Sequence, residues 1–126
     1  MQKPSVFLLV AGFVMGCSSS SDNDEPPTGE KFIGEWGKAF CLRLSECNPI
    51  GFEAKYSAYS DAQARQNGCA REFSDRVRVK ASDAEWSGPV GCARSSAQAC
   101  VDGTYQLRCE AFEDFEKNAP AICNGC

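Results

Sequence analysis

Nine cysteines constrain the fold of this 126-residue chain more than any other feature. Eight of them lie after residue 40, whereas Cys17 stands alone near the N-terminus. An even set of cysteines in an exported chain predicts disulfide bonds, here up to four. A domain below about 100 residues buries only a small core, so disulfides supply much of its stability. The disulfide candidates are Cys41, Cys47, Cys69, Cys92, Cys100, Cys109, Cys123 and Cys126.

The first 17 residues have the parts of a bacterial export signal in their usual order. Lys3 supplies a positive charge, residues 6–15 form an apolar run, and the small Gly16 precedes Cys17. The run has about half of the roughly 20 apolar residues that a transmembrane helix needs. The sequence Val14-Met15-Gly16-Cys17 resembles the lipobox of bacterial lipoprotein precursors. This resemblance implies a signal peptide at residues 1–16 and a lipid on the Cys17 sulfur.

An ordinary secretory signal cleaved nearby is the alternative, and Cys17 would then be a free thiol or a disulfide partner. Under the lipoprotein interpretation, the membrane is the first expected partner, reached through the N-terminal lipid anchor. Ser18 follows the cysteine, which in this family favours transfer to the outer membrane. The expected location is therefore the bacterial cell envelope, with lipid anchoring at the outer membrane.

Residues 18–29 consist mainly of serine, acidic residues and proline. Such a segment has too little apolar surface to offset the entropy of ordering, so we expect it to be disordered. The predicted organisation is a signal peptide at 1–16, a lipidated cysteine and tether at 17–29, and a cysteine-rich domain at 30–126.

The periodicity of the domain predicts a mainly α fold of about four short helices. Between residues 30 and 47, apolar side chains recur every three to four residues, with Thr28 as the N-cap and Asn48-Pro49 as the stop. A second, shorter segment follows at residues 52–59, and helical spacing returns at residues 69–80. Residues 91–100 predict a further, alanine-rich helix, and residues 109–118 a short acidic one whose carboxylates face solvent.

Local signals predict where these helices begin and end. Ser60 with Gln63, and Ser82 with Glu85, have the spacing of capping boxes. Three dipeptides that contain glycine predict breaks between helices: Asn67-Gly68, Gly88-Pro89 and Asp102-Gly103.

These helices exclude two disulfide pairings. Residues six apart on one helix differ by about 9 Å in rise, beyond the roughly 7 Å Cα limit for a bridge. Cys41 should therefore not pair with Cys47, and Cys92 should not pair with Cys100 if residues 91–100 are helical. The disulfides must join different segments, and their connectivity otherwise stays open.

Several of these features together resemble the small cysteine-rich lipoproteins of myxobacteria and their relatives. They are the lipobox, the tether, a Cys-x5-Cys first helix, an alanine-rich helix with Cys92, and a closing Pro-x2-Cys at residues 120–123. The family has no established activity. The resemblance therefore implies a location and a helical domain but no reaction.

The composition argues against several classes of function. The chain has no histidine, which removes the Ser-His-Asp and Cys-His catalytic arrangements. A zinc site usually needs two close ligand pairs, and only Cys123 and Cys126 have CxxC spacing, so we expect no metal. We also expect no cofactor. A net charge of −4 and an extracytoplasmic location argue against nucleic acid as a partner.

The predicted function is a non-enzymatic binding or structural module, with an envelope protein or polysaccharide as partner. Its candidate binding residues are Trp86, Arg76 and Arg78, because Trp86 adjoins a Gly-Pro break and the arginines belong to a basic cluster at 71–80. That cluster equally fits a solvated helix face. Trp36 lies on the first apolar stripe and is expected in the core. The alternative function is a small thiol-redox protein that uses Cys123 and Cys126.

Overall fold

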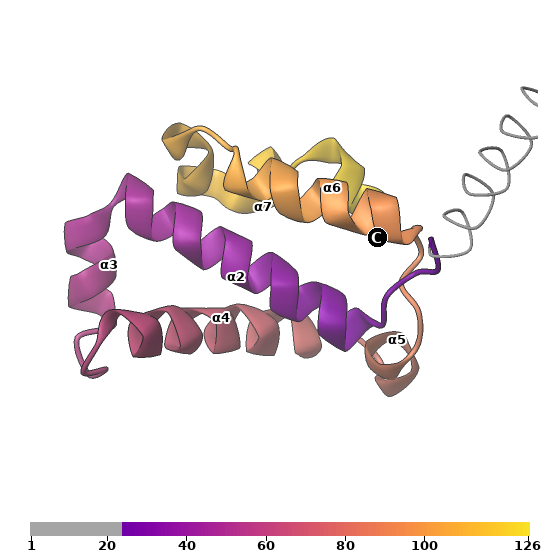
Figure 1. Cartoon of the computed structure of the whole chain (residues 1–126), viewed down its shortest axis with the longest axis horizontal. Coiled ribbons are helices and arrows are strands. Elements are labelled where there is room, and N and C mark those ends of the chain that lie inside the picture. The colour runs from indigo at the N-terminus through magenta and orange to yellow at the C-terminus, as the bar shows by residue number, and fades with distance from the viewer. Residues whose placement is uncertain (1–23) are drawn as a thin grey trace, which may run out of the picture.

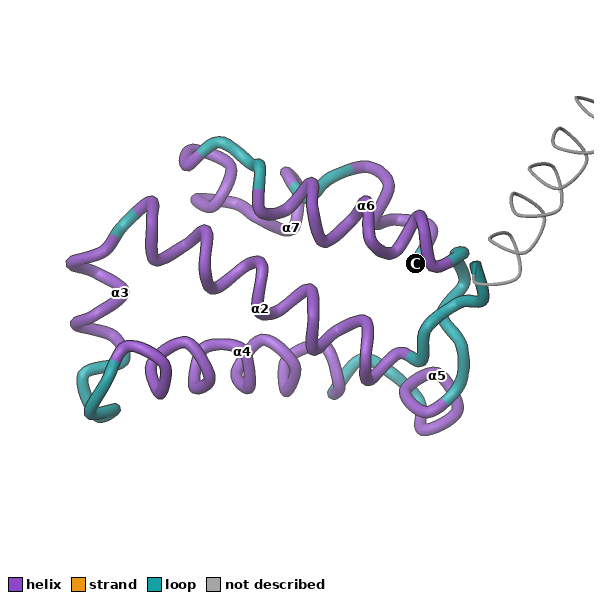
Figure 2. Tube along the Cα trace, viewed as in Figure 1, coloured by secondary structure: helices purple, strands orange, loops and turns teal. Residues whose placement is uncertain are grey.

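The computed structural model describes residues 24–126 and shows a mainly helical, disulfide-linked domain, as predicted (Figure 1). This part of the chain has loops and helices but no named strand (Figure 2). Its elements are α2 (Gly29–Cys47), α3 (Pro49–Lys55), α4 (Ala62–Arg78), α5 (Asp83–Ser87), α6 (Arg94–Tyr105), α7 (Phe115–Asn118) and the 3-10 helices η1 (Cys109–Asp114) and η2 (Ala121–Gly125). The six α-helices exceed the four expected because α3, α5 and α7 are only 7, 5 and 4 residues long.

Helix α2 is the centre of the domain and runs between α4 and α6 (Figure 1). It starts at Gly29 because the Thr28 hydroxyl accepts a hydrogen bond from the Lys31 backbone N–H at 3.3 Å, which satisfies a free helix donor. It ends at Cys47, where Asn48 caps α3. The predicted cap, stripe and stop of this helix are all confirmed.

Helix α4 is longer than predicted, because Asn67-Gly68 does not interrupt it. The ring of Tyr59 packs over Gly68, and a Cβ there would lie 2.6 Å from a ring carbon. This glycine therefore allows a close approach within the helix rather than making a turn. The N-cap is Asp61, whose carboxylate accepts from the Ala64 N–H at 2.8 Å, and not the expected Ser60.

The second predicted break, at Asp102-Gly103, does not occur, because both residues lie inside α6. A Cβ on Gly103 would lie 3.2 Å from the Pro120 ring, so this glycine also serves close packing. The helix begins at Arg94 rather than at residue 91. By contrast, the predicted cap of α5 is confirmed: the Ser82 hydroxyl accepts from the Glu85 N–H at 3.2 Å.

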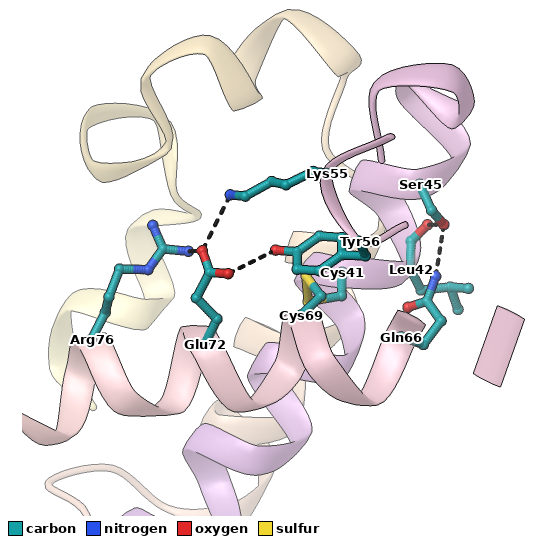
Figure 3. Close-up of a disulfide and its surroundings, with 9 residues drawn as sticks. All are labelled: Cys41, Leu42, Ser45, Lys55, Tyr56, Gln66, Cys69, Glu72 and Arg76. Carbon is teal, nitrogen blue, oxygen red and sulfur yellow. Dashed lines mark hydrogen bonds and ion pairs between the residues drawn. A yellow bond between two sulfur atoms is a disulfide. The ribbon is translucent and has the colours of Figure 1, made fainter. Parts of the chain in front are cut away.

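Four disulfides join the helices, and together they use all eight predicted cysteines. One links α2 to α4 and is drawn in Figure 3; the others link α2 to η1, α6 to η2, and the loop before α6 to the residue after η2. The pairs are Cys41–Cys69, Cys47–Cys109, Cys100–Cys123 and Cys92–Cys126. Neither excluded pairing occurs. Each bridge closes a loop long enough to contribute about 2 to 4 kcal/mol to stability.

The prediction of a disordered tether is wrong for residues 24–29, which pack against the first turn of α6 and the segment before it. The Asp24 carboxylate accepts from the backbone N–H and the hydroxyl of Ser95, at 2.7 and 3.1 Å. Pro27 is buried, and its carbonyl accepts from the Val90 N–H at 2.9 Å. The polar composition misled the prediction because these polar groups find partners across the fold. The signal peptide, Cys17 and the start of the tether lie outside the described residues.

Candidate functional site

Six aromatic side chains from four elements form a cluster on one side of α2. The closest rings are those of Phe40 and Phe115, with centroids 4.8 Å apart. The cluster comprises Phe32, Trp36, Phe40, Phe73, Phe112 and Phe115. Trp36 packs in the core as predicted, and its Nε1–H donates to the fully buried Thr104 hydroxyl at 2.8 Å. This bond joins α2 to α6.

Part of this cluster lines an open groove of about 500 Å³ between α4 and the C-terminal helices. The volume lies in the range of small-molecule sites, and aromatic walls are typical of them. Arg76 and Lys80 form one edge, and Glu113, Asp114 and Glu116 line the side given by η1 and α7. Lys80 and Glu116 form an ion pair at 3.7 Å. We call this feature the aromatic groove.

The sequence pattern did not predict the aromatic groove. It placed the acidic residues 110–116 on the solvated face of a short helix, and Glu116 is indeed 87% exposed. What it missed is that Phe112 and Phe115, which alternate with those acids, meet the rings of α2 and α4. The only local signal was the alternation of phenylalanine with carboxylates, which does not show what the rings face.

Trp86 and Arg78, two of the predicted binding residues, lie together. The Arg78 guanidinium stands over the Trp86 ring at 5.3 Å from the ring centroid, within cation–π range. Arg78 also forms an ion pair with Asp83 at the start of α5. Trp86 is half-buried and packs against the core around Phe32. It lines a cavity of about 330 Å³ beside Pro89 that we call the Trp86 pocket.

Arg76, the third predicted binding residue, belongs to a different group. Its guanidinium lies 3.6 Å from the carboxylate of Glu72, which also accepts from Lys55 Nζ at 3.1 Å and from the Tyr56 hydroxyl at 3.3 Å (Figure 3). We call these four residues the Glu72 cluster. The basic residues at positions 76, 78 and 80 therefore do not form a continuous positive patch, because each forms an ion pair with a different carboxylate: Arg76 with Glu72, Arg78 with Asp83, and Lys80 with Glu116.

Two groups in the Glu72 cluster have shifted titrations. The hydrogen bond to Glu72 raises the pKa of Lys55, because it favours the charged ammonium. Burial, followed by the negative charge of Glu72, raises the pKa of Tyr56. The Glu72 side chain thus contacts two basic side chains and one phenol, so basic groups outnumber acidic ones in the cluster.

Cys123 and Cys126 are not paired with each other. Cys123 bonds to Cys100 and Cys126 bonds to Cys92, so the CxxC sequence carries two separate cross-links. A thiol oxidoreductase cycles its two CxxC sulfurs between a dithiol and a mutual disulfide. The observed pairing favours a structural role for both residues.

Within residues 24–126, no three cysteine or acidic side chains converge in the way that metal ligands would. None of the helices described for the chain is long and apolar enough to cross a membrane. Four disulfides indicate an extracytoplasmic protein, because such bonds persist in oxidising compartments. Comparison with protein-family models, curated proteins and solved structures gives no significant match.

Proposed function

We propose that this chain is a lipid-anchored lipoprotein of the bacterial cell envelope, at the outer membrane, and that its domain is a non-enzymatic binding or structural module. The observation that carries the proposal is the complete pairing of the eight domain cysteines. It leaves Cys17, which ends the lipobox-like Val14–Cys17, as the ninth cysteine, and lipidation supplies its role. The likeness to myxobacterial cysteine-rich lipoproteins supports the same interpretation.

The free energy of burying the acyl chains is large enough to keep such a protein attached to the membrane. Each buried CH₂ of an acyl chain contributes about 0.8 kcal/mol, and bacterial lipoproteins carry two or three chains. One chain gives only reversible binding, whereas two or more give durable attachment. The domain itself needs no apolar membrane-binding surface to stay at the envelope.

Two surfaces support a binding role for the domain. The aromatic groove offers rings with charged edges, which suits an apolar or aromatic group of a partner. The Trp86 pocket offers an indole with an arginine stacked on it. Envelope protein and envelope polysaccharide are both partners of matching chemistry, because aromatic rings pack on either.

Intact mass spectrometry of the protein isolated from membranes tests the anchor. We expect a chain that begins at Cys17, carries acyl groups there and contains four disulfides. Cys17→Ser should abolish the acyl mass and release the protein from the membrane fraction, while the four bridges map unchanged. An unacylated wild-type Cys17, or cleavage elsewhere, would contradict the proposal. A Cys123–Cys126 bridge in the peptide map would instead reopen the redox alternative.

Co-sedimentation with purified peptidoglycan and capture from detergent-solubilised envelopes test the binding role. Wild type is compared with three variants. Trp86→Ala changes the Trp86 pocket, Phe112→Ser changes the aromatic wall of the groove, and Arg76→Glu changes both the Glu72 cluster and the charged edge of the groove. We expect one of the three to reduce a specific capture at least several-fold while the circular dichroism spectrum is kept. Equal behaviour of all four proteins would remove these surfaces as binding sites and leave a structural module.

A further inference from the structure

The described start of the chain is held on the domain, and this bears on how an anchored domain is oriented. Besides the two bonds from Ser95 to the Asp24 carboxylate, the Arg94 side chain donates to the Glu25 carbonyl at 3.3 Å. The backbone adds bonds from Val90 N–H to the Pro27 carbonyl and from Gly29 N–H to the Gly88 carbonyl, at 2.9 and 3.0 Å. We call residues 24–29 the clamp.

Asp24 also completes a helix end. Residue 93, the N-cap of α6, is an alanine and makes no side-chain cap bond, so the helix lacks a cap of its own. The Asp24 carboxylate supplies the acceptor that the Ser95 N–H needs, and its charge lies at the positive end of the helix dipole. Such capping stabilises the helix end, so it favours the state in which residue 24 stays on the domain.

From these contacts we infer that the clamp determines which end of the domain faces the membrane: the end with α5 and the C-terminal turn faces it, and the end with α3 faces away. This inference rests on the proposed lipid anchor at Cys17. Figure 1 shows the clamp, α5 and the C-terminus at one end of α2, and α3 at the other end.

The length of chain between Cys17 and Asp24 limits how the domain can be oriented. Seven residue steps separate Cys17 from Asp24, and a fully extended chain spans at most about 3.6 Å per residue, so the reach is at most about 25 Å. Helix α2 has 19 residues and is about 28 Å long at 1.5 Å per residue. An inverted domain, standing on α3, would hold Asp24 farther from the membrane than the chain can reach.

Without the clamp, the chain would be long enough for the domain to invert. Twelve steps separate Cys17 from Gly29, and they reach about 43 Å at the same spacing, which is enough to allow inversion. The clamp therefore excludes the inverted orientation by shortening the free length from about 43 Å to about 25 Å. The Trp86 pocket then lies toward the lipid surface, whereas α3 is presented away from it, where a partner in the aqueous space has access.

Paramagnetic broadening tests this orientation. The lipidated full-length mature protein, with its acylation confirmed by mass, is placed in lipid nanodiscs that contain a gadolinium-chelating lipid. We expect the amide signals of Ser87, Gly91 and Gly125 to broaden at least twofold more than those of Lys55 and Tyr59. In a matched variant, about twelve glycine and serine residues are inserted between Ser21 and Asp22. The clamp contacts are unchanged there, and the difference should shrink toward equality.

The outcomes separate the two proposals. Equal broadening at both ends of an acylated wild-type protein, or stronger broadening near α3, overturns the orientation and leaves the anchor intact. Absence of the acyl group overturns the anchor, and the orientation with it. A difference that persists undiminished in the lengthened variant also overturns the inference, because tether length would then not be its cause.

Discussion

The hydrogen bond between Trp36 and Thr104 gives a sharp test of how α2 and α6 are held together. Thr104 is fully buried and uses its hydroxyl twice: it accepts from Trp36 Nε1–H at 2.8 Å and donates to the Cys100 carbonyl at 2.9 Å. Thr104→Val keeps nearly the same shape but removes both interactions. The indole N–H is then left without this acceptor in the interior.

An unsatisfied buried donor costs about 1 to 3 kcal/mol, whereas burial of an additional methyl group returns part of that. We therefore expect Thr104→Val to lower the free energy of unfolding by about 2 kcal/mol. With a urea m-value of about 1 to 2 kcal/mol/M, the midpoint should fall by about 1 to 2 M. The measurement is urea unfolding of the oxidised protein, followed by far-ultraviolet circular dichroism at neutral pH.

A double-mutant cycle with Trp36→Phe isolates the bond from the loss of ring volume. The coupling between the two sites should be about 1 kcal/mol or more, because the two groups are directly bonded. Thr104→Ser keeps the hydroxyl and should retain the coupling to Trp36 despite its smaller side chain. If Thr104→Val unfolds within 0.3 M of wild type, or if the coupling is zero, the bond does not stabilise the α2–α6 pair and the reasoning is refuted.

Two further predictions follow from close packing and from the Glu72 cluster. Gly29→Ala places a Cβ 2.4 Å from the Glu85 carbonyl oxygen and should lower the free energy of unfolding by about 1 to 3 kcal/mol. Gly34→Ala on the same helix meets nothing within 4 Å and should raise the free energy of unfolding by about 0.5 to 1 kcal/mol. Thermal melts that rank the two variants in the opposite order would contradict this expectation. The raised pKa values of Tyr56 and Lys55 mean that their stabilisation is complete below about pH 10 and is lost as the pH rises through the folded-state values. Tyr56→Phe should therefore lose less stability than wild type between pH 8 and pH 11 in urea titrations, and an equal loss would show that Tyr56 does not contribute.

Predictions from the sequence succeeded where the interactions are local. The cap at Thr28, the stop at Asn48-Pro49 and the cap at Ser82 involve atoms within four residues of one another, so their residue types were enough. The exclusion of the Cys41–Cys47 pair followed from helical rise alone. The acidic segment before Asn118-Ala119-Pro120 was also expected to end there, as α7 does.

The same reasoning failed where a residue contacts a part of the chain that is distant in sequence. Gly68 and Gly103 were interpreted as breaks, yet each lies inside a helix and makes room for another side chain, that of Tyr59 or Pro120. Asp24 was assigned to a disordered tether, although its carboxylate meets Ser95 across 71 residues. In the candidate site, Trp86 and the two arginines were named for separate reasons; the structure places Arg78 on the Trp86 ring but Arg76 in another group, and the aromatic groove was missed.

The sequence alone therefore determined the helical class, the even set of eight cysteines, the ends of the best helices and the lipobox-like motif around Cys17. The tertiary structure alone decided which cysteines pair, which rings line the aromatic groove, and where the clamp joins the domain. The physical reason is the range of the interactions. Helix caps and periodicity depend on neighbours along the chain, whereas disulfide pairing, groove formation and clamping depend on which helices pack together, as Cys47 and Cys109 do across 62 residues.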